Sequence, residues 1–258
     1  TFSISEEKSA MKIPDVIGLG EVFSWTKVTQ RDPKTMKTLS AMLERNLVIN
    51  GHTAGLADKK LNAYVSSGIL SCHEPINFDQ VLERLRLGMW IMIREGSIRR
   101  DLTEIIKFVH TNKVYTDRLM FCSDGLDPID LTKFGHIDHC VRESVKAGLN
   151  QVDAISMASK NCFDYYNMGK DLGGIAPGKL ADILVFDDLN KLSEEHSAYQ
   201  LNIIKEDLTT QIKQLADNTI DTKNKNATQN ALETALIKMD LPATLPRPQD
   251  PRLMIKQL

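Results

Sequence analysis

The chain has 258 residues, of which 42% are hydrophobic and 26% charged, and its formal net charge is -2. This apolar fraction can fill a sizeable core, so we expect a globular protein of one large domain or two small ones. The charge balance leaves no basic excess for a phosphate backbone, which argues against nucleic acid polymers as partners. The sequence contains no apolar run near the roughly 18 residues needed to span a bilayer, so no membrane partner is expected.

The cysteines and the first residues indicate the compartment. Cys72, Cys122, Cys140 and Cys162 form no CxxC pair. Isolated cysteines of this kind are typical of reduced thiols in a cytosol rather than of a disulfide framework. The polar start TFSISEEKSA lacks the apolar core of a secretory signal. We therefore expect a soluble protein in the cytoplasm.

Short apolar runs alternate with segments of helical period. The runs predict buried strands at residues 16–20, 47–51, 68–72, 89–93 and 118–123. The segments between them predict helices at residues 32–46, 56–68, 77–88 and 100–112. Repeated alternation of strand and helix favours βα units in a parallel arrangement, and hence an α/β fold.

Local signals mark the ends of these helices. Asp32 can cap the first helix, and Pro33 suits its first turn. Gly68 is available as a left-handed stop for the second helix. Asn77 can cap the third. The apolar face expected for that third helix consists of Phe78, Val81, Leu82 and Leu85.

Polar residues that can bind metal fall where the predicted strands end. Glu21, His52, His73, Glu95 and Asp124 follow the five apolar runs in turn. The carboxyl ends of parallel strands share one face, so we expect these side chains to converge although they are far apart in sequence. Imidazole nitrogens and carboxylate oxygens hold divalent ions, and a bound ion turns water into a nucleophile near neutral pH.

Each residue also has a simpler interpretation. A single histidine in a loop is more often a surface or hydrogen-bonded residue than a ligand. Glu95 can form an ion pair with its neighbour Arg94. His136 and His139 lie at the start of a predicted helix, where a structural role is favoured over metal binding. Several successive strands nevertheless end in a polar residue, and burying such a residue costs desolvation free energy unless it has a partner. This favours a site that the residues share.

Several motifs follow one another along the chain. They are GLGE at 18–21, NGHTAGL at 50–56, LNAYVSSGILSCHE at 61–74, RLGMWIMIREGS at 86–97, FCSDGLDP at 121–128, GHIDH at 135–139 and GGIAPGKLADILVFDDL at 173–189. Together, over about residues 14–190, they resemble the adenine deaminases of the amidohydrolase superfamily. The resemblance implies a (β/α)8 barrel of TIM type with a small β-sandwich. It also implies two divalent metal ions, manganese or iron, and hydrolysis of adenine to hypoxanthine and ammonia.

The resemblance also implies roles for individual residues. Glu21 matches the carboxylate that bridges the two metals, and His52 and His73 match the histidine ligands after barrel strands five and six. Asp124 matches the aspartate of strand eight, which is a metal ligand and the catalytic proton shuttle. From their positions alone, and not from the resemblance, Glu74 and Glu95 are candidates for contacts to the purine nitrogens. Glu74 is either a catalytic proton donor or a group that orients His73.

The expected fold class is a partial metal-dependent hydrolase barrel containing strands 4–8, with part of the β-sandwich and a helical C-terminal tail. We assign residues 1–172 to the barrel, 173–192 to the sandwich segment, and 193–258 to two amphipathic helices with a proline-rich end. The sequence contains no His-x-His motif, which the family's site requires. We therefore expect a longer protein, a complementing chain or homo-oligomer, or an inactive remnant.

Three functions are compatible with these patterns. The first is deamination of adenine. The second is hydrolysis of another cyclic amide by the same fold. The third is a non-catalytic partial barrel that binds a partner through the helical tail, which packs either on the barrel or at a subunit interface. Metal content distinguishes the third from the other two, because four ligands without the His-x-His pair hold at most one ion weakly.

Overall fold

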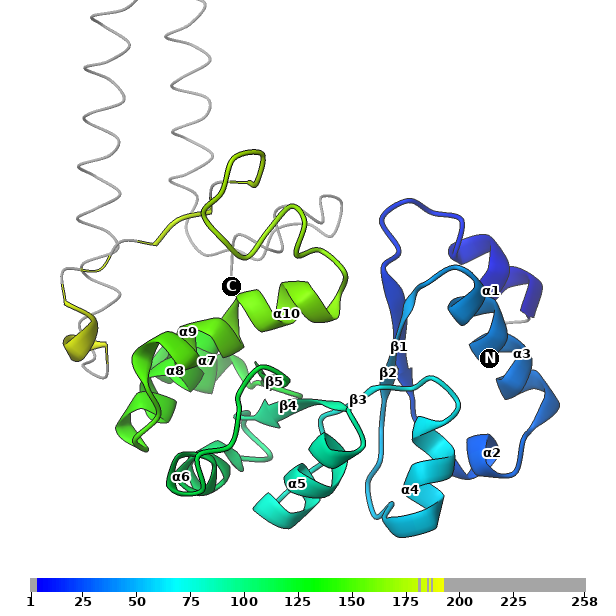
Figure 1. Cartoon of the computed structure of the whole chain (residues 1–258), viewed down its shortest axis with the longest axis horizontal. Helices are drawn as coiled ribbons and strands as arrows, with labels where there is room; N and C mark the ends of the chain where they lie inside the picture. The colour runs from blue at the N-terminus through cyan, green and yellow to red at the C-terminus, as the bar shows by residue number, and fades with distance from the viewer. Residues whose placement is uncertain (1–3, 181, 185, 187, 193–258) are drawn as a thin grey trace, which may run out of the picture. The chain divides into compact units, whose positions relative to one another are not determined.

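A computed structural model describes residues 4–180, 182–184, 186 and 188–192. A first compact unit ends at Asp182 and a second begins at Ile183, and each is considered by itself. The first unit alternates strands and helices (Figure 1). In chain order its elements are α1 (Ile4–Ala10), β1 (Gly18–Val22), α2 (Trp25–Thr29), α3 (Pro33–Glu44), β2 (Val48–Gly51), α4 (Asp58–Val65), β3 (Ser71–Cys72), α5 (Phe78–Arg86), β4 (Trp90–Arg94), α6 (Leu102–Thr111), β5 (Leu119–Cys122), α7 (Pro128–Phe134), α8 (Ile137–Lys146), α9 (Gln151–Ala158) and α10 (Lys160–Tyr165).

All strand pairs in the described part of the chain are parallel. β1 pairs with β2, with Leu19 opposite Ile49. A second sheet has the order β3-β4-β5, with Cys72 opposite Ile91. The predicted α/β class with parallel strands is therefore confirmed. β3 is shorter than predicted, although the Trp90 amide still donates to the Leu70 carbonyl at 2.7 Å.

The two sheets meet between β2 and β3. The Gly51 amide donates to Ser71 Oγ at 3.3 Å, and a Cβ atom at Gly51 would lie only 2.4 Å from the Ser71 carbonyl oxygen. Only glycine permits this approach. Tyr64 of α4 is fully buried, donates to the Val22 carbonyl and accepts from the His52 amide, both at 3.1 Å. Its hydroxyl thereby connects the carboxyl ends of β1 and β2.

The predicted helix signals act as expected. Asp32 accepts a hydrogen bond from the Thr35 amide at 2.9 Å, and Pro33 is the first residue of α3. Asn77 accepts from the Gln80 amide at 3.0 Å at the start of α5. Gly68 has a φ of 90° shortly after the end of α4, which is the left-handed conformation predicted for it.

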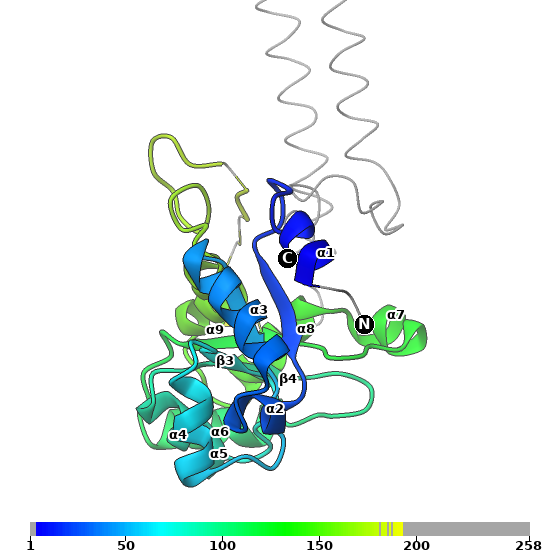
Figure 2. The same cartoon turned by 90° about the vertical axis from the view of Figure 1, so that its right-hand side faces the viewer.

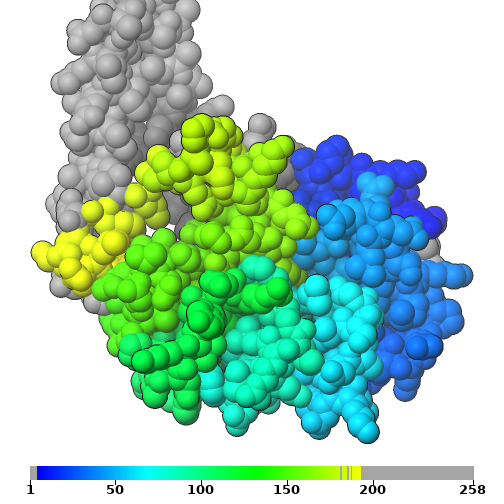
Figure 3. All heavy atoms as spheres, viewed as in Figure 1, coloured from blue at the N-terminus to red at the C-terminus, as the bar shows by residue number. Residues whose placement is uncertain are grey.

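Helices α3, α4, α5 and α6 lie on the outer side of the row of strands (Figure 1), and the perpendicular view shows α4, α5 and α6 together beneath β3 and β4 (Figure 2). In the space-filling view the segments follow one another in chain order, from blue α3 through cyan α4 to green α6 (Figure 3). The core lies between strands and helices, where Leu61, Ile91, Ile106 and Leu119 are completely buried. This packing fixes the strand ends that carry the polar residues.

The remaining domain predictions concern the end of the chain. Within the described residues of 173–192 the regular element is a short 3-10 helix, Leu189–Lys191. Three residues of that segment are outside the described set, so its β-sandwich stays a prediction. The predicted tail, 193–258, also lies outside the described residues. None of the helices in the part of the chain that the structure covers is long and apolar enough to cross a membrane.

Candidate metal centre

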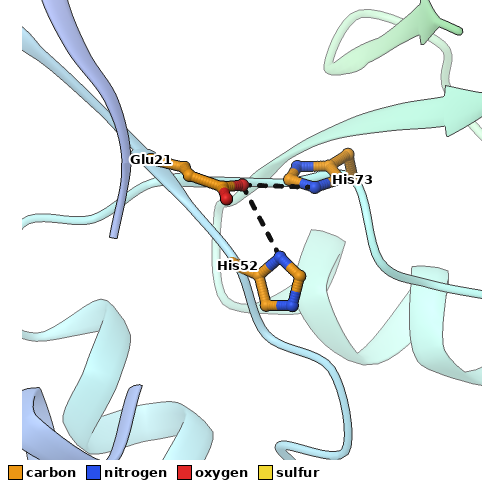
Figure 4. A group of neighbouring side chains, drawn as sticks. All are labelled: Glu21, His52 and His73. Carbon is orange, nitrogen blue, oxygen red and sulfur yellow. Dashed lines mark ion pairs between the residues drawn. The ribbon is translucent and has the colours of Figure 1, made fainter. Parts of the chain in front are cut away.

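Three of the predicted ligands converge from the ends of three strands (Figure 4). Glu21 belongs to β1, while His52 follows β2 and His73 follows β3. The Glu21 carboxylate points between the two imidazoles, with Oε2 at 3.6 Å from His52 Nδ1 and 3.4 Å from His73 Nε2. The three ligand atoms all lie within 4.8 Å of one another. Parallel pairing has thus brought together residues that are distant in sequence, as the sequence predicted.

A second group shares His73 with the first. His73 Nε2 lies 3.3 Å from Glu74 Oε1 and 4.0 Å from Asp124 Oδ2. Glu74 Oε1 is also 3.7 Å from His52 Nδ1. Asp124 follows β5 and has a φ of 44°, a left-handed conformation that a non-glycine residue adopts at some cost in energy. Its carboxylate is therefore directed towards the site by an unusual backbone turn.

The environment of His52 fits a bound cation. His52 Nδ1 is buried and has no hydrogen-bond partner among the described residues, although carboxylates of Glu21 and Glu74 face it. A buried nitrogen without a partner is costly, and a divalent ion between it and the carboxylates satisfies all of these groups. The Phe23 ring lies 4.6 Å from the His52 ring, which restricts rotation of the imidazole. Two nitrogens and one carboxylate are a suitable donor set for a transition metal.

The thiol of Cys122 belongs to neither group of candidate ligands in the described part of the chain. Burial, together with the charge of Asp124, raises the pKa of Cys122 to about 12 in the absence of a metal ion.

The sequence did not identify Arg94 as a part of the site. Its side chain is only 4% exposed, and Nη1 lies 2.7 Å from Glu74 Oε1 and 2.9 Å from Asp124 Oδ2. Nη2 lies 3.6 Å from Asp101 Oδ2. Burial alone lowers the pKa of Arg94, but the hydrogen bond to Asp124 and the charges of Glu74 and Asp101 outweigh it and raise that pKa. The guanidinium is therefore a permanent cation between two carboxylates of the second group.

Replacing Arg94 with methionine is expected to destabilise the chelated chain by about 3 kcal/mol, because it leaves neighbouring carboxylates without their counter-charge. Urea unfolding of the chelated chain measures this free energy. Arg100→Met is the matched control, since Arg100 pairs with Asp130 at 2.9 Å while its side chain is 47% exposed. Such a surface pair contributes under about 1 kcal/mol. Equal losses in the two variants would contradict the assigned role of Arg94.

Glu95, His136 and His139 lie in neither group. Glu95 was expected to converge with the other strand-end residues, but it instead faces His139, whose Nε2 lies 3.7 Å from Glu95 Oε1. In the alternative interpretation it paired with Arg94, which here pairs with Glu74, Asp101 and Asp124. His136 Nε2 lies 3.4 Å from Ser123 Oγ. Arg94 thus contacts Glu74 and Asp124 of the second group, whereas its chain neighbour Glu95 contacts His139.

Comparison with known proteins gives the family. Residues 20–229 match the amidohydrolase family. The chain is 62% identical over 195 residues to a protein named adenine deaminase from Cenarchaeum symbiosum, covering 76% of this chain and 32% of that protein. A Moorella thermoacetica protein of the same name is 39% identical over 194 residues, covering 75% of this chain and 33% of that protein. The chain thus spans about a third of the length of these relatives.

A solved structure supports the fold independently. The β-aspartyl dipeptidase of Fervidobacterium islandicum AW-1 superimposes with a TM-score of 0.51 at 16% identity, covering 70% of this chain and 56% of that chain. At this identity the likeness concerns the fold alone. Together with the family match over most of the sequence, it establishes that the chain belongs to the amidohydrolase family.

Proposed function

We propose that the chain carries the catalytic site of an adenine deaminase, which hydrolyses adenine to hypoxanthine and ammonia. The observation that carries the proposal is the convergence of Glu21, His52 and His73 around a buried imidazole nitrogen without a partner. The choice of adenine is supported by the names of the relatives, one of which is 62% identical. Arg94 also pairs with Glu74 and Asp124 and so holds these two carboxylates in place at the same site.

The proposed site takes two divalent ions, manganese or iron. Glu21, His52 and His73 would hold one ion. Asp124 would contribute to the other, whose His-x-His ligands the 258-residue sequence does not contain. When bound, the ions supply a Lewis acid and lower the pKa of water. The described residues have the imidazole and carboxylate ligands that such ions accept.

Asp124 is the proposed proton shuttle. Water adds at C6 of adenine, and its proton passes to a carboxylate oxygen of Asp124. Asp124 then returns the proton to the departing amine as the bond from C6 to the exocyclic nitrogen breaks and ammonia leaves. Arg94 Nη1, at 2.9 Å from Asp124 Oδ2, holds this carboxylate in a fixed orientation while it acts.

Of the two roles considered for Glu74, its contacts favour orientation of His73. Glu74 Oε1 lies 3.3 Å from His73 Nε2 and accepts a hydrogen bond from Arg94 Nη1 at 2.7 Å. These contacts fix the Glu74 carboxylate beside the imidazole, which supports a role in orienting His73. The contact of Glu95 with the purine ring stays a prediction.

Compartment and assembly belong to the same proposal. The four cysteines are free thiols. This state supports the proposed cytoplasmic location, because cytosolic thiols are kept reduced. A homo-oligomer or a complementing chain stays a prediction.

The direct test is ammonia release from adenine by the purified 258-residue chain. We expect ammonia and hypoxanthine in equal amounts after loading with manganese or iron, and neither product after chelation. Dihydropyrimidines and hydantoins serve as competing substrates. Ring opening of these compounds without turnover of adenine would instead support another cyclic amidohydrolase. A folded chain without metal binding or turnover would support the non-catalytic alternative.

A further inference from the structure

A second buried arginine lies outside the candidate metal centre, on the outer helix α5. Arg84 is 2% exposed, and its guanidinium faces the loop that follows β2. Nε donates to Thr53 Oγ1 at 2.9 Å, and Nη2 donates to the carbonyls of Thr53 at 3.1 Å and Leu56 at 2.8 Å. Nη1 donates to the Gln80 carbonyl at 3.1 Å. The side chain therefore directs most of its donors at one short loop.

That loop begins beside a candidate metal ligand. Thr53 is completely buried and follows His52 directly. The loop also carries its own turn, in which the Leu56 amide donates to the Thr53 carbonyl at 3.0 Å. Because Arg84 binds the carbonyls at both ends of this turn, it restricts the backbone that sets the position of His52.

The same network reaches the second histidine. Thr53 Oγ1 lies 2.6 Å from the sulfur of Cys72, which is also completely buried. The Glu74 amide donates to that sulfur at 3.2 Å. His73 lies between Cys72 and Glu74 in sequence. The chain of contacts from Arg84 through Thr53 and Cys72 thus connects the segments that carry His52, His73 and Glu74.

We propose that Arg84 is a positioning residue, which fixes the spacing of His52 and His73 through Thr53 and Cys72. A buried guanidinium is costly, and its ion pair is with Glu83 at 3.6 Å, whose side chain is 33% exposed. The other donors of Arg84, Nε and Nη2, bind the carbonyls at the two ends of the loop and the hydroxyl of Thr53, which follows His52. The inference rests on the metal site of the proposed function, whereas its structural part can be measured without metal.

The experiment compares Arg84→Met with Arg86→Met, an exposed arginine at the end of the same helix. Hydrogen exchange of the metal-free chain reports on the loop, and titration with Mn²⁺ followed by electron paramagnetic resonance reports on affinity. For Arg84→Met we expect exchange of the Leu56 amide to rise at least about tenfold. The dissociation constant for Mn²⁺ is expected to rise about tenfold or more. Arg86→Met is expected to change neither.

Thr53→Val tests the contact with Cys72 if Arg84→Met fails to fold, since it removes the hydroxyl and preserves the shape. It is expected to weaken Mn²⁺ binding about tenfold, and Arg84→Lys is expected to be intermediate. Unchanged exchange of the loop in folded variants would overturn the inference, and so would faster loop exchange with unchanged affinity. If the wild-type chain bound no Mn²⁺, the proposed function would fail, and loop exchange alone would decide whether Arg84 holds the loop.

Discussion

Replacing His73 with alanine is expected to abolish metal-dependent deamination while leaving the chain folded. His73 is shared by both groups of candidate ligands, with Nε2 at 3.4 Å from Glu21 Oε2 and 3.3 Å from Glu74 Oε1. Mutation of residues that only support a ligand already costs about 10- to 100-fold in metal affinity or activity. Loss of the ligand itself is expected to lower both by more than about a hundredfold. Ammonia release and bound manganese per chain are the two measurements.

The control for His73→Ala is His110→Ala. His110 is exposed in the last turn of α6 and belongs to neither group of candidate ligands in the described part of the chain. We expect it to retain wild-type turnover and metal content. Unchanged turnover in a folded His73→Ala variant would show that the metal centre has been placed wrongly.

Replacing Asp124 with asparagine is expected to separate proton transfer from metal retention. Asparagine keeps nearly the same shape but cannot accept the proton from water. We expect turnover to fall by about 10²- to 10⁴-fold, the usual contribution of a general acid-base group. One ion is expected to remain with Glu21, His52 and His73, which form a separate group of ligands. Turnover rates and metal content of the same preparation test both parts.

Asp117→Asn is the matched control for this variant. Asp117 is exposed and lies just before β5, whereas Asp124 follows the other end of that strand. A substitution there is expected to change neither turnover nor metal content. If Asp124→Asn retained full activity, another group would have to transfer the proton. If Asp124→Asn lost all bound metal, the assignment of Glu21, His52 and His73 as a separate group of ligands would be wrong.

The features that the sequence predicted well depend on local backbone chemistry or on the common direction of parallel strands. Caps and turns such as Asp32, Asn77 and Gly68 act through neighbouring backbone groups, so a short stretch of sequence suffices to find them. The convergence of His52 and His73 follows from one rule, that parallel strands carry their carboxyl ends on the same face. Each of these inferences required no knowledge of side-chain packing.

The two buried arginines could not be found in this way. The apolar pattern of α5 predicted that Phe78, Val81, Leu82 and Leu85 face the core, whereas Arg84 is 2% exposed and the two leucines are half-buried. A long charged side chain is buried only where partners from distant segments satisfy it, and those partners are not visible in helical periodicity. For Arg94 a signal did exist, because an arginine that ends a buried strand must find carboxylates nearby.

The seam between the two sheets passes through the proposed metal centre. Glu21 and His52 come from the sheet of β1 and β2, while His73 and Asp124 come from the sheet of β3, β4 and β5. An ion bound by residues of both sheets would link them, so its binding free energy would include the cost of bringing the two strand ends into the correct relative position. The dissociation constant for the ion would therefore depend on how well the two sheets are aligned. A substitution between the two sheets, for example at Gly51, where a Cβ atom would lie 2.4 Å from the Ser71 carbonyl oxygen, is expected to weaken ion binding although it changes no ligand.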